Sequence, residues 1–181
     1  MQAQYGDVVR HDTLPKLLLH NAERWPGEVA MREKEFGIWN EFTWSDYRDR
    51  VKEIALGLIE LGVRRGEVVS YLGKNRPEMV WSELAIHSIG CMSLGVYHDA
   101  MPQEVAYLVD YAEVRVVLAE DEEQVDKLLE VAEHSKSIER IVYFDPRGMR
   151  KYRDPRLVSW DELQAMAARA AAREPSRFAD A

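Results

Sequence analysis

The chain has 181 residues, of which 46% are hydrophobic and 31% are charged, and its formal net charge is −8. This composition supports one domain with a core. It excludes a nucleic-acid backbone as a favoured partner, because the net charge is negative and the basic residues form no stripe. The single cysteine, Cys91, excludes an internal disulfide and favours a reducing compartment. Residues 1–12 lack the apolar run of a signal peptide and no segment is long enough to span a membrane, so we expect a soluble, cytoplasmic protein.

The N-terminal part predicts a loose arm followed by a helix. We assign residues 1–11 to the arm. Asp12 or Thr13 can cap the helix, because a short polar side chain satisfies free backbone N–H groups at a helix start. Its leucine-rich face, which includes Leu14, should be buried. The helix should end at Trp25, because the residue before a proline is disfavoured in helical geometry.

Two short strands and a second helix come next. Residues 29–32 and 38–42 flank a Phe-Gly turn, which predicts an antiparallel hairpin. Thr43 and Asp46 have the spacing of a capping box, in which each side chain bonds the backbone N–H of the other residue. The helix that they begin should end at Gly62, since glycine readily adopts the left-handed conformation that closes many helices.

The stretch from residue 68 to residue 97 fixes the expected architecture. It consists of an apolar run at residues 68–72, a turn, an amphipathic segment at residues 78–89 and a second apolar run at residues 92–97. Strand, turn, helix and strand in this order are typical of a βαβ unit with parallel strands. We expect Met79 and Val80 on the inner side of the helix and a buried strand after it.

Strands and helices keep alternating after this unit. Buried strands are expected at residues 114–119 and 141–144. Helices should follow residue 102 and the acidic run at residues 120–123, whose charges favour the positive end of a helix dipole. A second capping-box pattern, at Ser159, predicts the last helix.

These elements predict an α/β fold with a mostly parallel sheet and helices on both faces, preceded by an N-terminal helix and a short β-hairpin. We place the domain at residues 12–174 and assign residues 175–181 to a tail or the start of a linker. In such sheets ligands bind beyond the carboxyl ends of the strands. Those ends correspond to loops at residues 73–76, 98–101, 120–121 and 145–148.

His98 is the best single site candidate at these strand ends. It directly follows a predicted strand and lies between Tyr97 and Asp99, so an ionisable ring stands where such sheets bind ligands. No histidine has the spacing of a zinc site, and no Ser-His-Asp set can be proposed. From these residues alone, no reaction can be assigned to the chain.

Other polar features favour structural roles. Gly73 and Lys74 lack the earlier glycine and the following Ser or Thr of a phosphate-binding loop, so they indicate a plain strand-to-helix turn. The acidic run at residues 120–123 could bind a metal, but a solvated helix start explains it more simply. Cys91 is typical of a small packed thiol.

A series of short segments carries a resemblance. They lie at residues 13–15, 42–47, 56–58, 61–63, 66–69, 74–78, 85–86, 90, 95–97, 102–107 and 119–127. In this order and spacing they resemble the start of the adenylate-forming enzymes, and the resemblance covers residues 12–178. It is greatest to the AMP-binding acyl-CoA synthetases, particularly the long-chain fatty acid–CoA ligases.

The resemblance implies a two-step ligation in fatty acid metabolism. ATP and a carboxylic acid give an acyl-adenylate and pyrophosphate, and the CoA thiol then displaces AMP. ATP, Mg²⁺ and CoA are therefore the expected cofactors of the parent enzyme. The family's Ser-, Thr- and Gly-rich loop ending in Pro-Lys-Gly, its ribose-binding aspartate and its C-terminal domain with the catalytic lysine have no counterpart in this sequence.

This departure predicts an N-terminal fragment of a ligase that is inactive on its own. We assign no catalytic, cofactor-binding or metal-binding residue to it and expect no bound cofactor. Its expected partners are the rest of its own polypeptide and, in the full enzyme, a small carboxylic acid, with self-association through an exposed apolar face. Tyr97, His98 and Asp99 are expected to face the acyl or CoA channel.

Two alternatives stay open at this point. One is the same part of a medium-chain or aromatic-acid CoA ligase. The other is a free-standing, non-catalytic binding or scaffold domain, which would have a closed apolar surface where a fragment exposes one. A long-chain substrate would also favour a membrane-peripheral location of the full enzyme.

Overall fold

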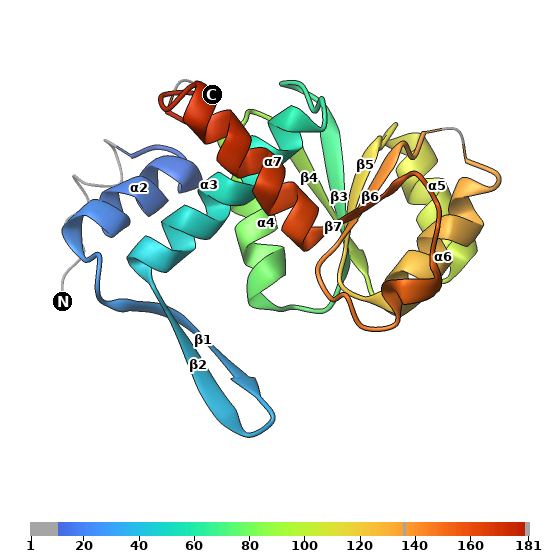
Figure 1. Ribbon diagram of the computed structural model, residues 1–181, viewed down its shortest axis with the longest axis horizontal. Coiled ribbons are helices and arrows are strands. Elements are labelled where there is room, and N and C mark those ends of the chain that lie inside the picture. The colour runs from blue at the N-terminus through green and yellow to red at the C-terminus, as the bar shows by residue number, and fades with distance from the viewer. Residues whose placement is uncertain (1–10, 136, 180–181) are drawn as a thin grey trace.

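The computed structural model describes residues 11–135 and 137–179, and its elements follow the expected order (Figure 1). The predicted arm at residues 1–11 lies outside the described residues except for His11. The helices are α2 (Leu14–Arg24), α3 (Trp44–Glu60), α4 (Pro77–Ser88), α5 (Pro102–Tyr111), α6 (Glu122–Ala132), the short 3₁₀ helix η1 (Met149–Lys151) and α7 (Trp160–Arg173). The strands are β1 (Val29–Glu35), β2 (Ile38–Thr43), β3 (Val68–Gly73), β4 (Met92–Tyr97), β5 (Val116–Ala119), β6 (Arg140–Tyr143) and β7 (Leu157–Ser159).

The strands form a parallel five-stranded sheet and a separate hairpin. The order in the large sheet is β4-β3-β5-β6-β7, and every neighbouring pair in it is parallel. Strands β1 and β2 pair antiparallel and project from the body of the molecule (Figure 1). The predicted α/β fold, with its N-terminal helix, hairpin and mostly parallel sheet, is confirmed.

Helices cover both faces of the sheet, and each face has its own core. Helices α3, α4 and α7 lie on one face, with α2 packed outside them, whereas α5 and α6 lie on the other (Figure 1). Alternate residues of β3 serve the two cores: Val69 and Tyr71 join the first and Leu72 joins the second. This alternation follows from the period of two along a strand.

The predicted helix ends are confirmed in detail. The Asp46 N–H donates to Oγ1 of Thr43 at 3.1 Å, and the Thr43 N–H donates back to Oδ2 of Asp46 at 2.9 Å. Ser159 and Glu162 repeat this box at the start of α7. Gly62 closes α3 with a φ of +88°, in the left-handed region that a glycine reaches without strain.

The structure differs from the expected packing at Leu14, and it adds detail at α4 and at one further strand. Leu14 is 55% exposed, because only one side of α2 faces its neighbours. On α4, Met79 and Val80 pack against the first core as expected, although they are only partly buried. Trp81 is buried as well, since that helix packs against α2 and α3 as well as the sheet. The strand β7 was not expected, because three residues are too short to show a hydrophobic period.

The largest difference from expectation concerns strand β4, which lies at an edge of the sheet instead of being buried. Among the described residues its one strand neighbour is β3. Of its six residues only Val96 is buried, whereas Met92 is 56% exposed and Tyr97 is 84% exposed. The second apolar run of the predicted βαβ unit therefore forms a strand, as expected, but not a buried one.

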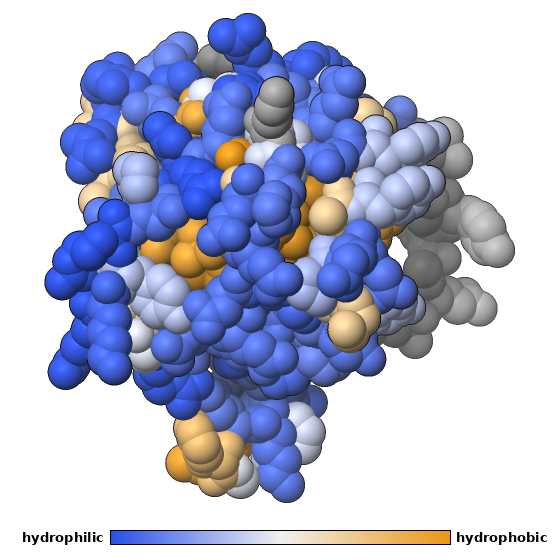
Figure 2. All heavy atoms as spheres, turned by 90° about the vertical axis from the view of Figure 1, so that its right-hand side faces the viewer, coloured by the Kyte–Doolittle hydropathy of each residue, from blue (hydrophilic) through white to orange (hydrophobic). Residues whose placement is uncertain are grey.

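Hydrophobic side chains also reach the surface at the tip of the hairpin. Phe36, Ile38 and Trp39 are all exposed there. In Figure 2 the lower projection carries a group of orange and pale spheres, below a mainly hydrophilic surface on the α5–α6 side. Within the described part of the chain, no helix combines the length and the apolar character needed to cross a membrane.

Candidate functional site

The sheet has one point where the chain leaves neighbouring strands in opposite directions. From β3 the chain passes through α4 to β4 on one side, and from β5 it passes through α6 to β6 on the other. In open α/β sheets, ligands bind outside the carboxyl ends of the strands at such a switch point. The loops at residues 73–76 and 120–121, both expected from the sequence, meet here.

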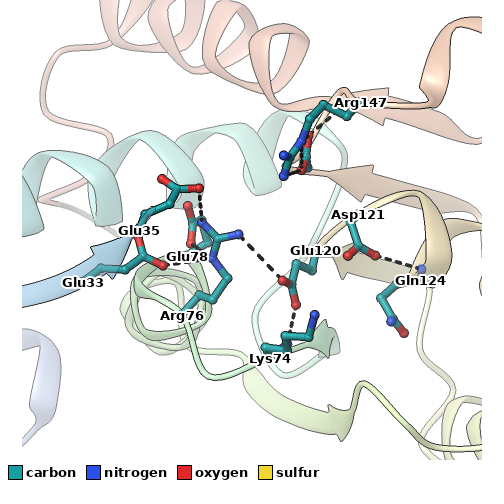
Figure 3. Close-up of polar contacts among 10 residues, drawn as sticks. Glu33, Glu35, Lys74, Arg76, Glu78, Glu120, Asp121, Gln124 and Arg147 are labelled. Carbon is teal, nitrogen blue, oxygen red and sulfur yellow. Dashed lines mark hydrogen bonds and ion pairs between the residues drawn. The ribbon is translucent and has the colours of Figure 1, made fainter. Parts of the chain in front are cut away.

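Arg76 lies among carboxylates at this switch point (Figure 3). Its Nε atom is 3.0 Å from Oε1 of Glu33 on β1 and 3.5 Å from Oε2 of Glu78 on α4. Its Nη2 atom is 3.9 Å from Oε1 of Glu35, and its Nη1 atom is 3.7 Å from Oε1 of Glu120. One guanidinium thus connects the hairpin, the start of α4 and the end of β5.

Glu120 is the buried member of this group. The residue is 6% exposed, and its Oε2 atom accepts the backbone N–H of Lys74 at 2.5 Å. Gly73 makes this approach possible, because a Cβ atom there would lie 2.7 Å from Cβ of Glu120. Asp121 instead caps α6 by accepting the Gln124 N–H at 3.2 Å. The acidic run therefore begins α6 as predicted, but its first residue is buried at the site.

A cleft of about 250 Å³ opens beside Arg76, and we call it the acidic cleft. It is lined by Glu35, Tyr71, Arg76, Glu78, Glu120, Phe144, Asp145 and Arg147. Arg147 donates from Nε to Oδ2 of Asp145 at 2.7 Å, so the charges of these two side chains are paired with each other. The lining holds four carboxylates and two guanidinium groups, which leaves two negative charges in excess.

The ionisation of these groups reflects burial and pairing. Burial raises the pKa of Glu78, because a charged carboxylate loses solvation there. Burial alone would lower the pKa of Arg76, but the nearby carboxylates of Glu78, Glu33 and Glu120 outweigh it and raise that pKa. The hydrogen bonds from Arg147 lower the pKa of Asp145.

The predicted candidates Tyr97 and His98 line a second depression, which we call the β4 hollow. It measures about 570 Å³ and is bounded by Gly73, Lys74, Asn75, Met79, Gly95, Val96, Tyr97 and His98. The backbone carbonyl of His98 accepts a hydrogen bond from Nζ of Lys127 at 2.6 Å, which ties this loop to α6. Asp99 is exposed and does not line the hollow, so the structure brings together two of the three predicted residues.

Other sequence features have structural roles in the described residues. Within residues 11–135 and 137–179, no group of three or more His, Cys, Asp or Glu side chains is arranged to hold a metal ion. Cys91 is buried and its Sγ atom lies 3.1 Å from the carbonyl oxygen of Arg64. Burial raises the pKa of this thiol, which disfavours the reactive thiolate. Cys91 is thus a packed thiol, as predicted.

The acidic cleft itself was not found from the sequence. Arg76 was only part of a strand-end loop, and in the structure it directly precedes α4 without a side-chain capping bond. Tyr71 was part of an apolar run and Asp145 part of a turn. The available signal was that charged residues stand in all four of the strand-end loops, and the parallel sheet brings those loops to one edge.

Comparison with known proteins identifies the family. The family model described as AMP-binding enzyme matches residues 18–176. The long-chain-fatty-acid–CoA ligase ACSBG2 of Mus musculus is 26% identical over 155 residues, which is 85% of this chain and 23% of that protein. An uncharacterized protein of Mycobacterium tuberculosis is 33% identical over 136 residues, covering 75% of this chain and 74% of that one.

Solved structures agree with this fold. An anthranilate CoA ligase in complex with anthranoyl-AMP superposes with a TM-score of 0.75 at 19% identity, covering 90% of this chain and 30% of that one. The coronafacic acid ligase of Pectobacterium brasiliense gives a TM-score of 0.73 at 16% identity, covering 83% of this chain and 29% of that one. The chain thus spans about a quarter of the long-chain ligases that it matches. The resemblance carried by the sequence motifs is confirmed, and the chain belongs to the AMP-binding enzyme family.

Proposed function

We propose that this chain is the N-terminal part of an ATP-dependent acyl-CoA synthetase that acts on fatty acids. The observation that carries the proposal is the family match over residues 18–176, together with long-chain ligases among the relatives. The full enzyme would convert a fatty acid, ATP and CoA into acyl-CoA, AMP and pyrophosphate. We place it in the cytoplasm, with contact to membrane surfaces for its long-chain substrate.

The acidic cleft does not fit the nucleotide. A triphosphate needs cationic or N–H donors around it, whereas the acidic cleft carries an excess of negative charge. Its volume of about 250 Å³ also lies below the roughly 300–1,000 Å³ of typical ligand pockets. We therefore assign ATP and Mg²⁺ to other parts of the full enzyme and expect this chain alone to form no acyl-adenylate.

The β4 hollow is our proposed wall of the acyl or CoA channel. It lies at the carboxyl end of β4, and the exposed side chains of Met92, Tyr97 and Met101 belong to the same strand and the loop that follows it. Apolar surface of this kind gains free energy when another element or an acyl chain covers it. Self-association of the isolated chain through this surface is part of the same proposal.

The proposal that this chain belongs to a longer ligase is tested first by reading the coding sequence beyond Ala181. A Ser-, Thr- and Gly-rich loop ending in Pro-Lys-Gly within a few dozen codons would support a ligase. A stop codon directly after Ala181 would contradict it as the native product. Carboxylate-dependent ATP–pyrophosphate exchange should then be found in the longer polypeptide and be absent from residues 1–181 alone.

The channel wall is tested by kinetics of the longer polypeptide. Tyr97→Ala and His98→Ala should raise the KM for acid or CoA, whereas Tyr111→Ala should leave it unchanged, because Tyr111 is equally exposed but lies outside the hollow. Asp99→Ala tests the third predicted residue. Unchanged kinetics in the first two variants would exclude this wall.

A free-standing, non-catalytic domain is the second candidate. The observation that favours it is the Mycobacterium tuberculosis relative, of which this chain covers 74%. It predicts a stop codon after Ala181 and no ligase activity in any native product.

A panel of long-chain, medium-chain and aromatic acids, assayed with the longer polypeptide, distinguishes the fatty-acid ligase from an aromatic-acid or medium-chain ligase.

A further inference from the structure

The acidic cleft contains a buried hydroxyl that lacks a hydrogen-bond partner. Tyr71 on β3 is 4% exposed, and its hydroxyl has no partner among the described residues. The same residue lines the cleft, beside Gly73 and Glu120. A buried hydroxyl without a partner is unfavourable, because it has lost the hydrogen bonds that it made to water.

A second unsatisfied atom in the cleft is a carboxylate oxygen. The Oε2 atom of Glu78 is buried without a hydrogen bond, and its nearest cation is Nε of Arg76 at 3.5 Å. Arg76 is shared with Glu33, Glu35 and Glu120, as the contacts in Figure 3 show. Only the contact with Glu33, at 3.0 Å, is a hydrogen bond, and the other three carboxylates lie 3.5–3.9 Å from the guanidinium.

Charge and size together define what would complete this site. The lining has two negative charges in excess, and its unsatisfied atoms are a carboxylate oxygen and a phenol oxygen, both of which accept hydrogen bonds. A volume of about 250 Å³ is comparable to roughly eight water molecules, so it admits one planar or tetrahedral cationic head group and excludes a nucleotide.

We propose that the acidic cleft binds a guanidinium or ammonium group, which donates to Oε2 of Glu78 and to the hydroxyl oxygen of Tyr71. Such a group supplies both the positive charge and the donors that the lining lacks. It can belong to an arginine or lysine side chain of a protein segment or to a small free molecule. This inference goes beyond the proposed ligase function and does not depend on it.

The test is a titration of the chain observed by two-dimensional amide NMR. The probes are methylguanidinium chloride and the blocked tripeptide acetyl-Gly-Arg-Gly-amide, with acetyl-Gly-Gln-Gly-amide as the neutral control. Saturable shifts are expected at the backbone amides of Lys74, Arg76 and Glu120. Binding of the arginine tripeptide indicates a protein source, whereas binding of methylguanidinium alone indicates a small free molecule; either supports the site.

Matched variants decide whether the cleft is responsible. Glu78→Gln and Tyr71→Phe keep the shape of their side chains and should each weaken binding, with a loss of about tenfold for Glu78→Gln. Glu41→Gln removes the same charge from the exposed part of the hairpin, where Glu41 pairs with Arg32, and should leave binding unchanged. The dispersion of each spectrum reports whether the variant is folded.

Three results would overturn the proposal. They are the absence of saturable shifts with both cationic probes, equal binding of the glutamine tripeptide, and equal weakening by Glu41→Gln and Glu78→Gln. The last two would show that the shifts arise from nonspecific contact or from the net charge of the chain.

Discussion

Strands β3 and β4 pair with each other in register along their whole length, yet their surroundings differ. Strand β3 has a strand on each side, and its residues Val69–Leu72 are all buried. Strand β4 has one strand neighbour among the described residues, and of its side chains only Val96 is buried. Of two apolar runs of similar length, the one in β3 therefore lies in the interior of the sheet and the one in β4 lies at an exposed edge.

This difference identifies β4 as the strand of the large sheet that is open to further contacts among the described residues. An apolar strand at an open edge exposes hydrophobic area and unpaired backbone groups, both of which favour association. The charged residues at the carboxyl end of β3 are paired with one another around Arg76, whereas the hollow at the end of β4 has no comparable ion pair among its lining residues. Matched substitutions on the two strands should separate these environments.

The largest expected contrast comes from truncating a leucine on each strand. Leu72 of β3 is fully buried, so Leu72→Ala should lower the free energy of unfolding by about 2–5 kcal/mol. Leu94 of β4 is partly exposed, so Leu94→Ala should cost less than about 2 kcal/mol. Urea denaturation of both variants measures the contrast. Equal losses would indicate that β4 is covered in solution.

Adding one methyl group to a glycine on each strand is the next test. In Gly73→Ala the new Cβ would lie 2.7 Å from Cβ of Glu120 and 2.9 Å from Cε1 of Tyr71, which should cost about 1–3 kcal/mol. In Gly95→Ala the nearest atom is Cε of Met79 at 3.7 Å, so the change should stay within about 0.5 kcal/mol. Thermal unfolding gives both values, and a destabilising Gly95→Ala would contradict the open β4 surface.

Removing a tyrosine hydroxyl should change stability on β3 but not on β4. Tyr71→Phe removes a buried hydroxyl without a partner, so it should raise the free energy of unfolding by about 1 kcal/mol. Tyr97→Phe alters an exposed side chain and should leave stability unchanged within about 0.5 kcal/mol. Denaturant unfolding without added cations is the measurement. A less stable Tyr71→Phe variant would mean that this hydroxyl is hydrogen bonded in solution.

The smallest expected effect concerns pH. Burial raises the pKa of Glu78 above its ordinary value of 4.5, so folding favours its protonated form, and stability should fall as pH rises above 4.5. Glu78→Gln should remove this decline. The change in the free energy of unfolding should be less than about 1 kcal/mol, because the side chain is partly exposed.

Asp46 provides a control of opposite sign. Its hydrogen bonds with Thr43 lower its pKa below 3.8, so its contribution is present above that pH and is lost as the pH falls below it. Asp46→Asn should therefore reduce the loss of stability in acid. Unfolding curves recorded between pH 3 and pH 7 test both variants, and the same pH dependence in both would contradict the assignment.

Local sequence rules were sufficient for most of the fold. The boxes at Thr43 and Ser159, the glycine at residue 62 and the prolines that begin α4 and α5 act within a few residues, so their patterns can be read directly. The alternation of strand and helix then predicts a parallel sheet with helices on both faces.

Long-range pairing explains what could not be predicted. The hydrogen bond between Lys74 and Glu120 joins residues 46 positions apart, and no local pattern indicates it. The exposure of β4 depends on the order of strands in space, because an apolar run has the same sequence pattern at an edge as in the interior. The candidate His98 was correctly placed at a strand end, whereas its role in a channel stays a prediction.

Amide hydrogen exchange of residues 1–181 tests the contrast between the two strands most directly. The amides of Val69–Leu72 should exchange only on global unfolding, because β3 is bonded on both sides. In β4, alternate amides point away from β3 and should exchange orders of magnitude faster. Uniform protection of β4, equal to that of β3, would contradict the account and indicate that the edge is already covered, by a second copy or by another part of the chain.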